Sequence, residues 1–411
     1  MIRILTARDA PSLIQRKTVR LEEAELAVMP ILTDIRERGD AALLEYARKF
    51  DRFDGPSVRV HVIGSLEPDF RRAVETAAEN IRGYAQAQLP KEWFIDYADG
   101  RRLGQIVRPL DAMGAYVPAG RYPLPSTVLM TVIPAQVAGV ETICVACPNP
   151  SVEILGIAHL LGVKHMFRMG GAQAIAALAY GTETVPKVDR IVGPGNIYVA
   201  AAKKLLAGEV GIDFVAGPTE IVVIAAGGNP RWIAADLLAQ AEHDVDASAI
   251  LLTTSRSLAE AVAKEVETQL AELPTAHVAR ASIDNNGAIV VADSLDQAIE
   301  ISNALAPEHL ALHDGALLHK IRHAGAVFVG PTSTEAAGDY CSGPNHVLPT
   351  SGAARIRGGL SAADFVKVIA VQELSADGIR RLTPSIAKLA RAEGLEAHAR
   401  SAEIRHEARH D

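Results

Sequence analysis

The stretch that decides the fold class is residues 189–203, which read DRIVGPGNIYVAAAK. Its first part, Asp189–Val192, is a short apolar run, and Gly193–Asn196 leads from that run into an Ala-rich segment. A strand that passes through a glycine-containing turn into a helix is the repeating unit of a parallel sheet covered by helices. A second junction of this kind runs from Met169 through Gly170–Gln173 into another Ala-rich segment. The two junctions predict an α/β fold.

The same alternation of short apolar runs and helical segments continues outward from this stretch, beginning near residue 105. The other predicted strands are Thr142–Ala146, Glu220–Ala225, Ala249–Thr254, Ala288–Val291 and Ala326–Val329. Strands that alternate with helices favour parallel sheets with helices on their faces. Because a single sheet would need too many strands, we expect two Rossmann-like parallel-sheet domains.

Helices are predicted before this alternating region. Leu21–Arg38 has apolar residues at helical spacing, Gly39 ends this helix, and Asp40 can cap the next one. A further helix is predicted to start near Glu67-Pro68. The chain is therefore expected to begin with a helical extension.

The C-terminal segment is also expected to be helical, with Thr383-Pro384 as a start signal and Gly394 as an interruption. The chain is expected to divide into four parts. They are an N-terminal extension at 1–20, a first α/β domain from 21–115 with 220–360, a second α/β domain at 116–219, and a helical C-terminal segment at 361–411.

Composition excludes several classes of protein. The chain has 411 residues, of which 49% are hydrophobic and only 4% aromatic, and its net charge is −8. An acidic chain with few rings argues against nucleic-acid binding and against anionic lipid. The most apolar stretch, residues 128–147, is interrupted by Pro134 and Glu141 and is too broken to span a membrane. Residues 1–10 lack an apolar signal core, so we expect a cytoplasmic protein.

The three cysteines cannot form a closed disulfide framework. Cys144 and Cys147 are spaced as C-x-x-C, which suits a redox or zinc pair, but Cys144 lies in an apolar run and no second C-x-x-C occurs. The pattern favours a structural role for both thiols over redox or metal chemistry.

The two glycine-containing junctions are candidate phosphate sites. Ligands of α/β sheets bind where strands end, and glycine lets a backbone approach an anion closely. Neither Gly193–Asn196 nor Gly170–Gln173 matches G-x-G-x-x-G, and no Walker A loop is present. Each junction is as consistent with a tight turn as with a phosphate site.

The segment from Asn229 to His243 gives the clearest clue to a site. Asn229 can cap a helix, and at helical spacing Gln240 falls within the apolar stripe while His243 flanks it. A buried glutamine must be hydrogen-bonded or coordinated, and residues three apart can converge on one ion. The alternative is a core amide bonded to backbone, with His243 as a C-terminal cap.

Three further polar segments have two interpretations each. Glu308 and His309 could supply proton-transfer groups, or could be a helix start with a partly exposed histidine. The polar loop 338–346 is typical of function but also of simple turns. Glu393 and His398 lie on the last predicted helix, where charged residues are usually only solvated.

Taken together, these segments resemble the histidinol dehydrogenase family, because seven motifs occur in the family's order. They are Gly193–Val199, Ala216–Glu220, Asp236–His243, Pro307–Leu310, Gly338–Tyr340, Asn345–Thr350 and Glu393–His398. The resemblance covers nearly the whole chain. It implies an aldehyde-dehydrogenase-like arrangement of the two Rossmann-like domains, with helical terminal extensions and NAD contacts in the 116–219 domain.

The resemblance also implies a role for each matched residue. One zinc ion would be bound by Gln240, His243, Asp339 and His398, with His398 coming from the partner of a homodimer. Glu308 and His309 match the family's catalytic pair. Substrate contacts would come from Thr219, His346, Glu393, Glu308 and the zinc ligands, and NAD contacts from Tyr116, Gln173 and Asn196. Thr219 stands where members commonly have Ser, and Ala119 where they often have Gly; neither change removes a ligand or a catalytic group.

The implied activity is the NAD-dependent, zinc-dependent oxidation of L-histidinol to L-histidine through the aldehyde, the last steps of histidine biosynthesis. A paralogue that uses the same machinery on another amino or sulfonated alcohol is the nearest alternative. A non-catalytic metal-binding scaffold would be expected to lack Glu308 or His309, and both are present. A hydrolase using Cys341 or Glu308 is disfavoured because no nucleophile elbow occurs.

Overall fold

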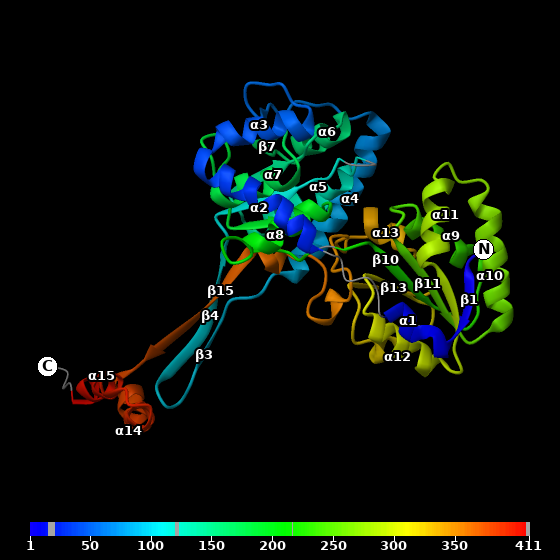
Figure 1. Cartoon of the computed structure of the whole chain (residues 1–411). Helices are drawn as coiled ribbons and strands as arrows, with labels where there is room; N and C mark the ends of the chain where they lie inside the picture. The colour runs from blue at the N-terminus through cyan, green and yellow to red at the C-terminus, as the bar shows by residue number, and fades with distance from the viewer. Residues whose placement is uncertain (15–20, 120–122, 216, 408–411) are drawn as a thin grey trace. The chain divides into compact units, whose positions relative to one another are not determined.

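The structure is a computed structural model of the chain, in which residues 1–14, 21–119, 123–215 and 217–407 are described (Figure 1). The chain forms two compact units. Unit 1 comprises Met1–Gln88 and Leu110–Phe365, and unit 2 comprises Leu89–Pro109 and Val366–Asp411. Unit 1 contains two six-stranded sheets, named sheet A and sheet B here, and unit 2 contains a three-stranded sheet.

Sheet A has the order β1-β12-β11-β10-β13-β14, and all of its neighbouring strands are parallel. The strands are β1 (Arg3–Thr6), β10 (Glu220–Ile224), β11 (Ser248–Thr253), β12 (Ala288–Val291), β13 (His309–Leu312) and β14 (Ala326–Val329), and a short helix, α13 (Glu335–Tyr340), follows the last. From β10 the chain therefore builds one side of the sheet through β11 and β12, and the other side through β13 and β14.

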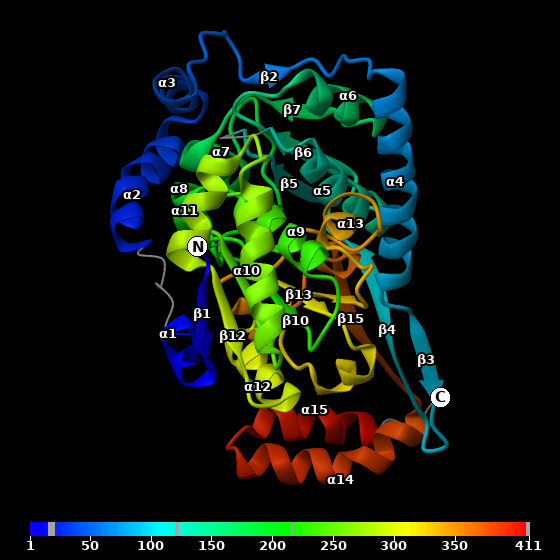
Figure 2. The same ribbon diagram turned by 90° about the vertical axis from the view of Figure 1, so that its right-hand side faces the viewer.

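Both faces of sheet A are covered by helices (Figures 1 and 2). Ile221 and Val223 of β10 point to one face, where they pack with α9 (Pro230–Ala241), α10 (Arg256–Leu270) and α11 (Ala276–Asn286). Val222 and Ile224 point to the other face, which α1 (Ala10–Ile14) and α12 (Leu295–Leu305) cover. Alternate residues of a strand face opposite sides, so a sheet buried on both sides needs the continuous apolar runs seen in the sequence.

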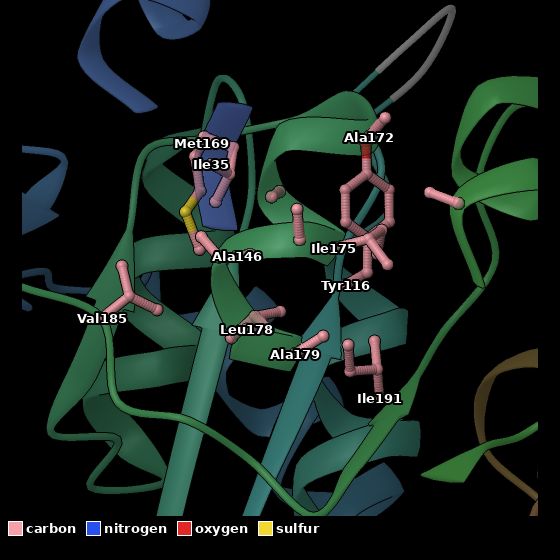
Figure 3. Packing of buried hydrophobic residues seen from close by; sticks show 14 of the residues in the cluster. Ile35, Tyr116, Ala146, Met169, Ala172, Ile175, Leu178, Ala179, Val185 and Ile191 are labelled. Carbon is pink, nitrogen blue, oxygen red and sulfur yellow. The ribbon is translucent and has the colours of Figure 1, made fainter. Parts of the chain in front are cut away.

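Sheet B has the order β2-β7-β6-β5-β8-β9, in which only β2 is antiparallel to its neighbour. Its strands are β2 (Arg59–Val60), β5 (Ala112–Tyr116), β6 (Thr142–Ala146), β7 (His165–Phe167), β8 (Arg190–Val192) and β9 (Gly211–Ile212). One face is covered by α2 (Leu21–Arg38), α3 (Asp40–Asp51), α7 (Gly171–Tyr180) and α8 (Ile197–Leu206), and the other by α4 (Pro68–Gln88), α5 (Pro125–Ala138) and α6 (Val152–Leu160). Figure 3 shows the first face, where Leu178 and Ile175 of α7 pack near Tyr116 and Ile191 of the sheet.

Unit 2 consists of an antiparallel sheet and a helical hairpin. The sheet has the order β15-β4-β3, with β3 (Trp93–Asp96), β4 (Arg101–Pro109) and β15 (Val366–Leu374). The hairpin is formed by α14 (Ala376–Ala392) and α15 (Glu396–Glu407), and Gly394 joins them with a φ of 77°. Among the described residues, its buried apolar cluster consists of Ala387, Ala390 and Ala399.

The predicted α/β class with two largely parallel sheets is confirmed. The predicted strands Thr142–Ala146, Ala288–Val291 and Ala326–Val329 have the observed bounds, and Leu21–Arg38 is one helix. The predicted helix start at Thr383-Pro384 is wrong, because Pro384 lies inside α14. That helix instead starts at Ala376, after Ser375 caps it by accepting a hydrogen bond from the backbone N–H of Gly378. Among the described residues, no helix combines the length and the apolar character that crossing a membrane requires.

The structure divides the chain differently from the expected domain boundaries. The expected 1–20 extension contains β1, which pairs with β12 at the edge of sheet A; its residues 15–20 lie outside the described residues. α2 and α3 are expected to share a domain with residues 220–360. They lie on sheet B instead, because their apolar faces pack in one cluster with α7 and α8. The expected helical segment 361–411 includes the long strand β15.

Candidate functional site

The polar residues singled out in the sequence gather at the amino-terminal edge of sheet A. Thr219 directly precedes β10, Glu308 directly precedes β13, and these two strands pair in parallel. Gln240 lies near the end of α9, the helix that returns the chain from the carboxyl edge to this edge. We name Thr219, Gln240, Glu308, His309 and Asp339 the amino-edge cluster. Ligands of open α/β sheets usually bind at the opposite edge, so that rule does not locate this cluster.

A hydrogen-bonded chain connects three members of the cluster. The amide nitrogen of Gln240 donates to the hydroxyl of Thr219 over 2.5 Å, and this hydroxyl donates to Oε2 of Glu308. The backbone N–H of Glu220 donates to the same Oε2 over 3.0 Å. Gln240 is 1% exposed, as the helical stripe predicted, and its amide bonds a side chain rather than the backbone. Glu308 is thereby fixed through one oxygen.

His309 is buried between acceptors on both ring nitrogens. Nδ1 lies 3.3 Å from the carbonyl oxygen of Glu220, and Nε2 lies 3.3 Å from Oδ1 of Asp339. Nδ1 also lies 3.6 Å from Oε2 of Glu308. Burial opposes a charge on the ring, but the carboxylates of Glu308 and Asp339 outweigh it and raise the pKa of His309 above its usual value. The arrangement makes His309 a proton-holding group.

Two more histidines, His346 and His243, interact electrostatically with Asp339 of the cluster. Burial acts to raise the pKa of Asp339, but the hydrogen bond and charge of His309, followed by the charges of His346 and His243, lower it overall. Nδ1 of His346 lies 2.9 Å from the backbone carbonyl of Asp339. Burial lowers the pKa of His346, which disfavours the charged form of its ring. His243 is exposed, just beyond the end of α9.

One buried and one half-buried carboxyl group beside the cluster were not predicted. Glu335 is 2% exposed, its Oε2 has no hydrogen-bond partner among the described residues, and burial raises its pKa well above the usual range. Burial also raises the pKa of Asp236 to about 6, although Thr334 donates a hydrogen bond to it. A spacing signal was available, because each acid stands four residues before a cluster member, Gln240 or Asp339, and so on the same helix face.

The donor atoms of the cluster fit zinc in part. Gln240 and Asp339 are members, and His243 interacts electrostatically with Asp339. Amide, carboxylate and imidazole groups are donors that zinc accepts. No group of three or more His, Cys, Asp and Glu side chains is arranged as a metal site in the described part of the chain. The fourth expected ligand, His398, lies in α15 of unit 2.

The expected cofactor residues lie at the carboxyl edge of sheet B. Tyr116 ends β5, and its hydroxyl accepts the backbone N–H of Gly171 over 3.2 Å at the start of α7. Gln173, in the first turn of α7, donates to Oδ2 of Asp51 over 3.1 Å. Asn196 caps α8 by accepting the N–H groups of Tyr198 and Val199. Tyr116 and Gln173 are therefore close neighbours. Asn196 lies at the other glycine-containing junction, Gly193–Asn196, between β8 and α8.

The remaining predicted residues have distinct outcomes. Glu393 and His398 belong to unit 2, where both are exposed. The alternative of a helix start with a partly exposed His309 is wrong, because His309 begins strand β13 and is 3% exposed. Part of the predicted loop 338–346 is helical, as α13 ends at Tyr340. Ala216, in the second motif, lies outside the described residues.

The cysteines take no part in either group of residues. Cys144 and Cys147 are buried free thiols, and burial raises the pKa of each to about 12. A thiol that stays protonated is a poor nucleophile and metal ligand. This supports the structural role predicted for both. Cys341 is free and exposed.

Comparisons with known proteins agree on one family. A family model described as histidinol dehydrogenase matches residues 14–406. A histidinol dehydrogenase from Geobacter sulfurreducens is 50% identical over 400 residues, which is 93% of this chain and 93% of that protein. A histidinol dehydrogenase structure from Elizabethkingia anophelis has a TM-score of 0.93 at 39% identity, with 98% of both chains covered. An acetylating aldehyde dehydrogenase from Geobacillus thermoglucosidasius has a TM-score of 0.52 at 14% identity over 90% of this chain and 95% of that one, which shows a shared fold alone and confirms the predicted aldehyde-dehydrogenase-like arrangement.

Proposed function

This chain belongs to the histidinol dehydrogenase family, and on that premise we propose that it oxidises L-histidinol to L-histidine through the aldehyde, with zinc and two molecules of NAD. The observation that carries the proposal is the amino-edge cluster, in which a buried imidazole stands between two carboxylates. Buried ionisable groups that perturb one another are typical of catalytic sites.

His309 is proposed to take the hydroxyl proton of the alcohol. Its Nδ1 is held at the carbonyl of Glu220, which fixes the ring and leaves Nε2 as the nitrogen that exchanges a proton. Nε2 now faces Oδ1 of Asp339 and becomes available when Asp339 turns to another partner, as a zinc ligand must. Because the contact with Asp339 is one cause of the raised pKa of His309, its loss shifts that pKa back towards the ordinary imidazole value near neutrality, where the ring can accept a proton.

Glu308 is proposed to activate the water that converts the aldehyde to its hydrate. Both hydrogen bonds that hold Glu308, from Thr219 and from the Glu220 N–H, use Oε2. This leaves Oε1 to accept a proton from water. The same carboxylate lies 3.6 Å from Nδ1 of His309, so its negative charge stabilises the imidazolium that forms when the ring takes a proton.

The metal and the cofactor are assigned to separate edges. Gln240, His243 and Asp339 would hold zinc together with His398 of the partner in a homodimer, and Thr219, His346 and Glu393 would contact substrate. Tyr116, Gln173 and Asn196 would contact NAD. When bound, zinc supplies a charge that orients the amino alcohol, and NAD supplies the hydride acceptor. The side chains of the protein bind the metal, the substrate and the cofactor, and His309 and Glu308 accept the protons.

The proposal is tested by following NADH formation with L-histidinol. We expect turnover with NAD, loss of turnover after chelation, and its return on adding zinc, because the cluster offers metal donors but no electron-pair acceptor of its own to hold the substrate nitrogens. Other amino alcohols serve as matched substrates without the imidazole. Efficient turnover of one of these with none of histidinol would assign the chain to a paralogous activity, and turnover unaffected by chelation would remove zinc from the mechanism.

A further inference from the structure

Sheet B has the strand order of a dinucleotide-binding sheet. From β5 the chain builds outward through β6 to β7, and then through β8 to β9 on the other side of β5. The direction of winding reverses between β5 and β8, and a dinucleotide lies across the carboxyl edge at such a point. In these sheets an Asp or Glu that follows the second strand binds the ribose hydroxyls of the adenosine half. That acid favours NAD over NADP.

The second strand of sheet B has no such acid in its own sequence. β6 ends at Ala146, and residues 147–152 read CPNPSV. A carboxylate lies beside this segment all the same, because Asp51 reaches it from the last position of α3. A Cβ atom at Gly170 would lie 2.6 Å from Cβ of Pro148 and 2.9 Å from Oδ1 of Asp51. Asp51 and Pro148 therefore meet at Gly170, where β7 leads into α7.

Asp51 is fixed at this place through one oxygen. Oδ2 accepts the backbone N–H of Gly170 over 2.9 Å and the amide nitrogen of Gln173 over 3.1 Å. Oδ1 is thus the oxygen left for a ligand. Gln173 is itself an expected NAD contact, and the start of α7 also binds the hydroxyl of Tyr116. The carboxylate is therefore part of the same small region as two proposed cofactor residues.

Asp51 does not stabilise α3, the helix at whose end it lies. A negative charge at the C-terminal end of a helix is disfavoured by the helix dipole. The next residue, Arg52, has a left-handed φ of 53°, which is strained for a residue with a side chain. The position of Asp51 is therefore not explained by α3; its Oδ2 serves the start of α7, and its Oδ1 is left for a ligand.

We propose that Asp51 selects NAD over NADP by accepting hydrogen bonds from the adenosine ribose and repelling a 2′-phosphate. This inference rests on the proposed function, since it takes Tyr116 and Gln173 as cofactor contacts. Arg168 strengthens the case, because its Nε donates to the carbonyl of Pro148 over 3.4 Å and its charge acts on Asp51. Removal of the carboxylate leaves an arginine at the place where NADP-binding sheets use one for the 2′-phosphate.

The test is direct binding of NADH and NADPH, followed by cofactor fluorescence. We expect the wild-type chain to bind NADH at least about tenfold more tightly, because like charges repel at close range, and Asp51→Asn to reduce that ratio about tenfold, mainly by tighter NADPH binding. Asp54→Asn is the matched control, since it removes the same charge from an exposed position three residues away and should keep the wild-type ratio. An unchanged ratio in Asp51→Asn would mean that Asp51 only caps α7, and the inference would be wrong.

A second measurement needs no variant. Wild-type protein is titrated with 5′-AMP and with the same nucleotide carrying a 2′-phosphate, and equal affinities would also overturn the inference. The wild-type assay with L-histidinol and NAD separates the two proposals. Turnover with NAD, combined with an unchanged NADH-to-NADPH ratio in Asp51→Asn, refutes only the role of Asp51. A wild-type chain that binds neither NADH nor NADPH refutes the proposed function and this inference together.

Discussion

His309 and Glu308 are adjacent in sequence, and the backbone of one residue, Glu220, holds both of their side chains. The carbonyl of Glu220 fixes the ring of His309, and the N–H of the same residue fixes Oε2 of Glu308. One residue at the start of β10 therefore positions both groups. Glu220 holds each group through a single atom. Oε1 of the carboxylate is left for chemistry, and Nε2 of the imidazole becomes available when Asp339 turns away from it.

Replacing each of the two groups is expected to slow a different half of the reaction. His309→Asn should lower the rate of alcohol oxidation by about 10²–10⁴, because no base remains for the hydroxyl proton. Glu308→Gln keeps the hydrogen bonds at Oε2 but cannot accept a proton, so it should mainly slow oxidation of the aldehyde. NADH formation is measured separately with L-histidinol and with the aldehyde. Aldehyde oxidation at the wild-type rate in Glu308→Gln would contradict the role assigned to that residue.

At the scale of residues, the sequence predicts which side chains are buried better than it predicts their hydrogen-bond partners. Helical periodicity places Gln240 inside the apolar stripe, and it is buried. The same periodicity cannot show that its amide bonds Thr219, which precedes a different element. Glu335 was missed for a related reason. An acid one turn before Asp339 looks solvated in sequence, and only packing beneath α13 reveals that it is buried.

At the scale of elements, the junction between β8 and α8 is held together by a buried ion pair. Lys203 of α8 is 2% exposed, forms a salt bridge with Asp213, and donates to the carbonyl of Gly193 over 3.1 Å. Asp213 in turn accepts the N–H of Gly193 over 2.8 Å. Both backbone groups of Gly193 are thus tied to one pair. The pair fixes the turn that leads to Asn196.

Breaking this pair is expected to cost far more stability than breaking its surface neighbour. Lys203→Met leaves Asp213 charged and buried, which costs about 3–5 kcal/mol. Lys204→Met is the matched control, because Lys204 pairs with Glu25 at the surface over 2.5 Å and such pairs contribute less than about 1 kcal/mol. Urea unfolding of the two variants is compared with that of the wild-type chain. Equal losses would show that Lys203 is not buried as described.

Elements are predicted well where one local rule decides them. The inner strands β6, β8, β10, β11 and β12 are buried on both faces, so their apolar runs and the turn residues after them give the bounds to within one residue. The sequence did not predict β1, β2, β5, β7, β9 and β13. The start of α14 was predicted wrongly because Thr383-Pro384 resembles a helix start signal, whereas Pro384 lies inside a helix that begins at Ala376. The edge that carries the cluster was also not predictable, since it depends on where α9 and α13 end relative to β10 and β13.

At the scale of the whole molecule, unit 2 has too small a core to be stable alone. Its buried apolar cluster is formed by alanines, whereas Trp93, Ile95 and Val368 of its sheet and Leu389 of α14 are exposed within the single chain. A unit that buries so little apolar surface needs further protein surface to pack against. His398 lies on this unit, next to the buried Ala399. These features support the proposal that unit 2 contributes to the site of a second copy.

A mixture of two inactive variants tests whether sites are shared between subunits. His309→Asn damages the cluster of its own chain, and His398→Asn is expected to remove a zinc ligand from the partner's site. In a hybrid dimer, the intact cluster of the second chain receives the intact His398 of the first, so one of the two sites is complete. Refolding the variants together should restore about a quarter of wild-type activity, because half of the dimers are hybrids with one working site. Mixing His309→Asn with Asp339→Asn is the control and should restore nothing, since both changes damage the same half of the site. If the first mixture also stays inactive while its hybrids demonstrably form, each site is built within one chain, and His398 cannot be the partner's zinc ligand.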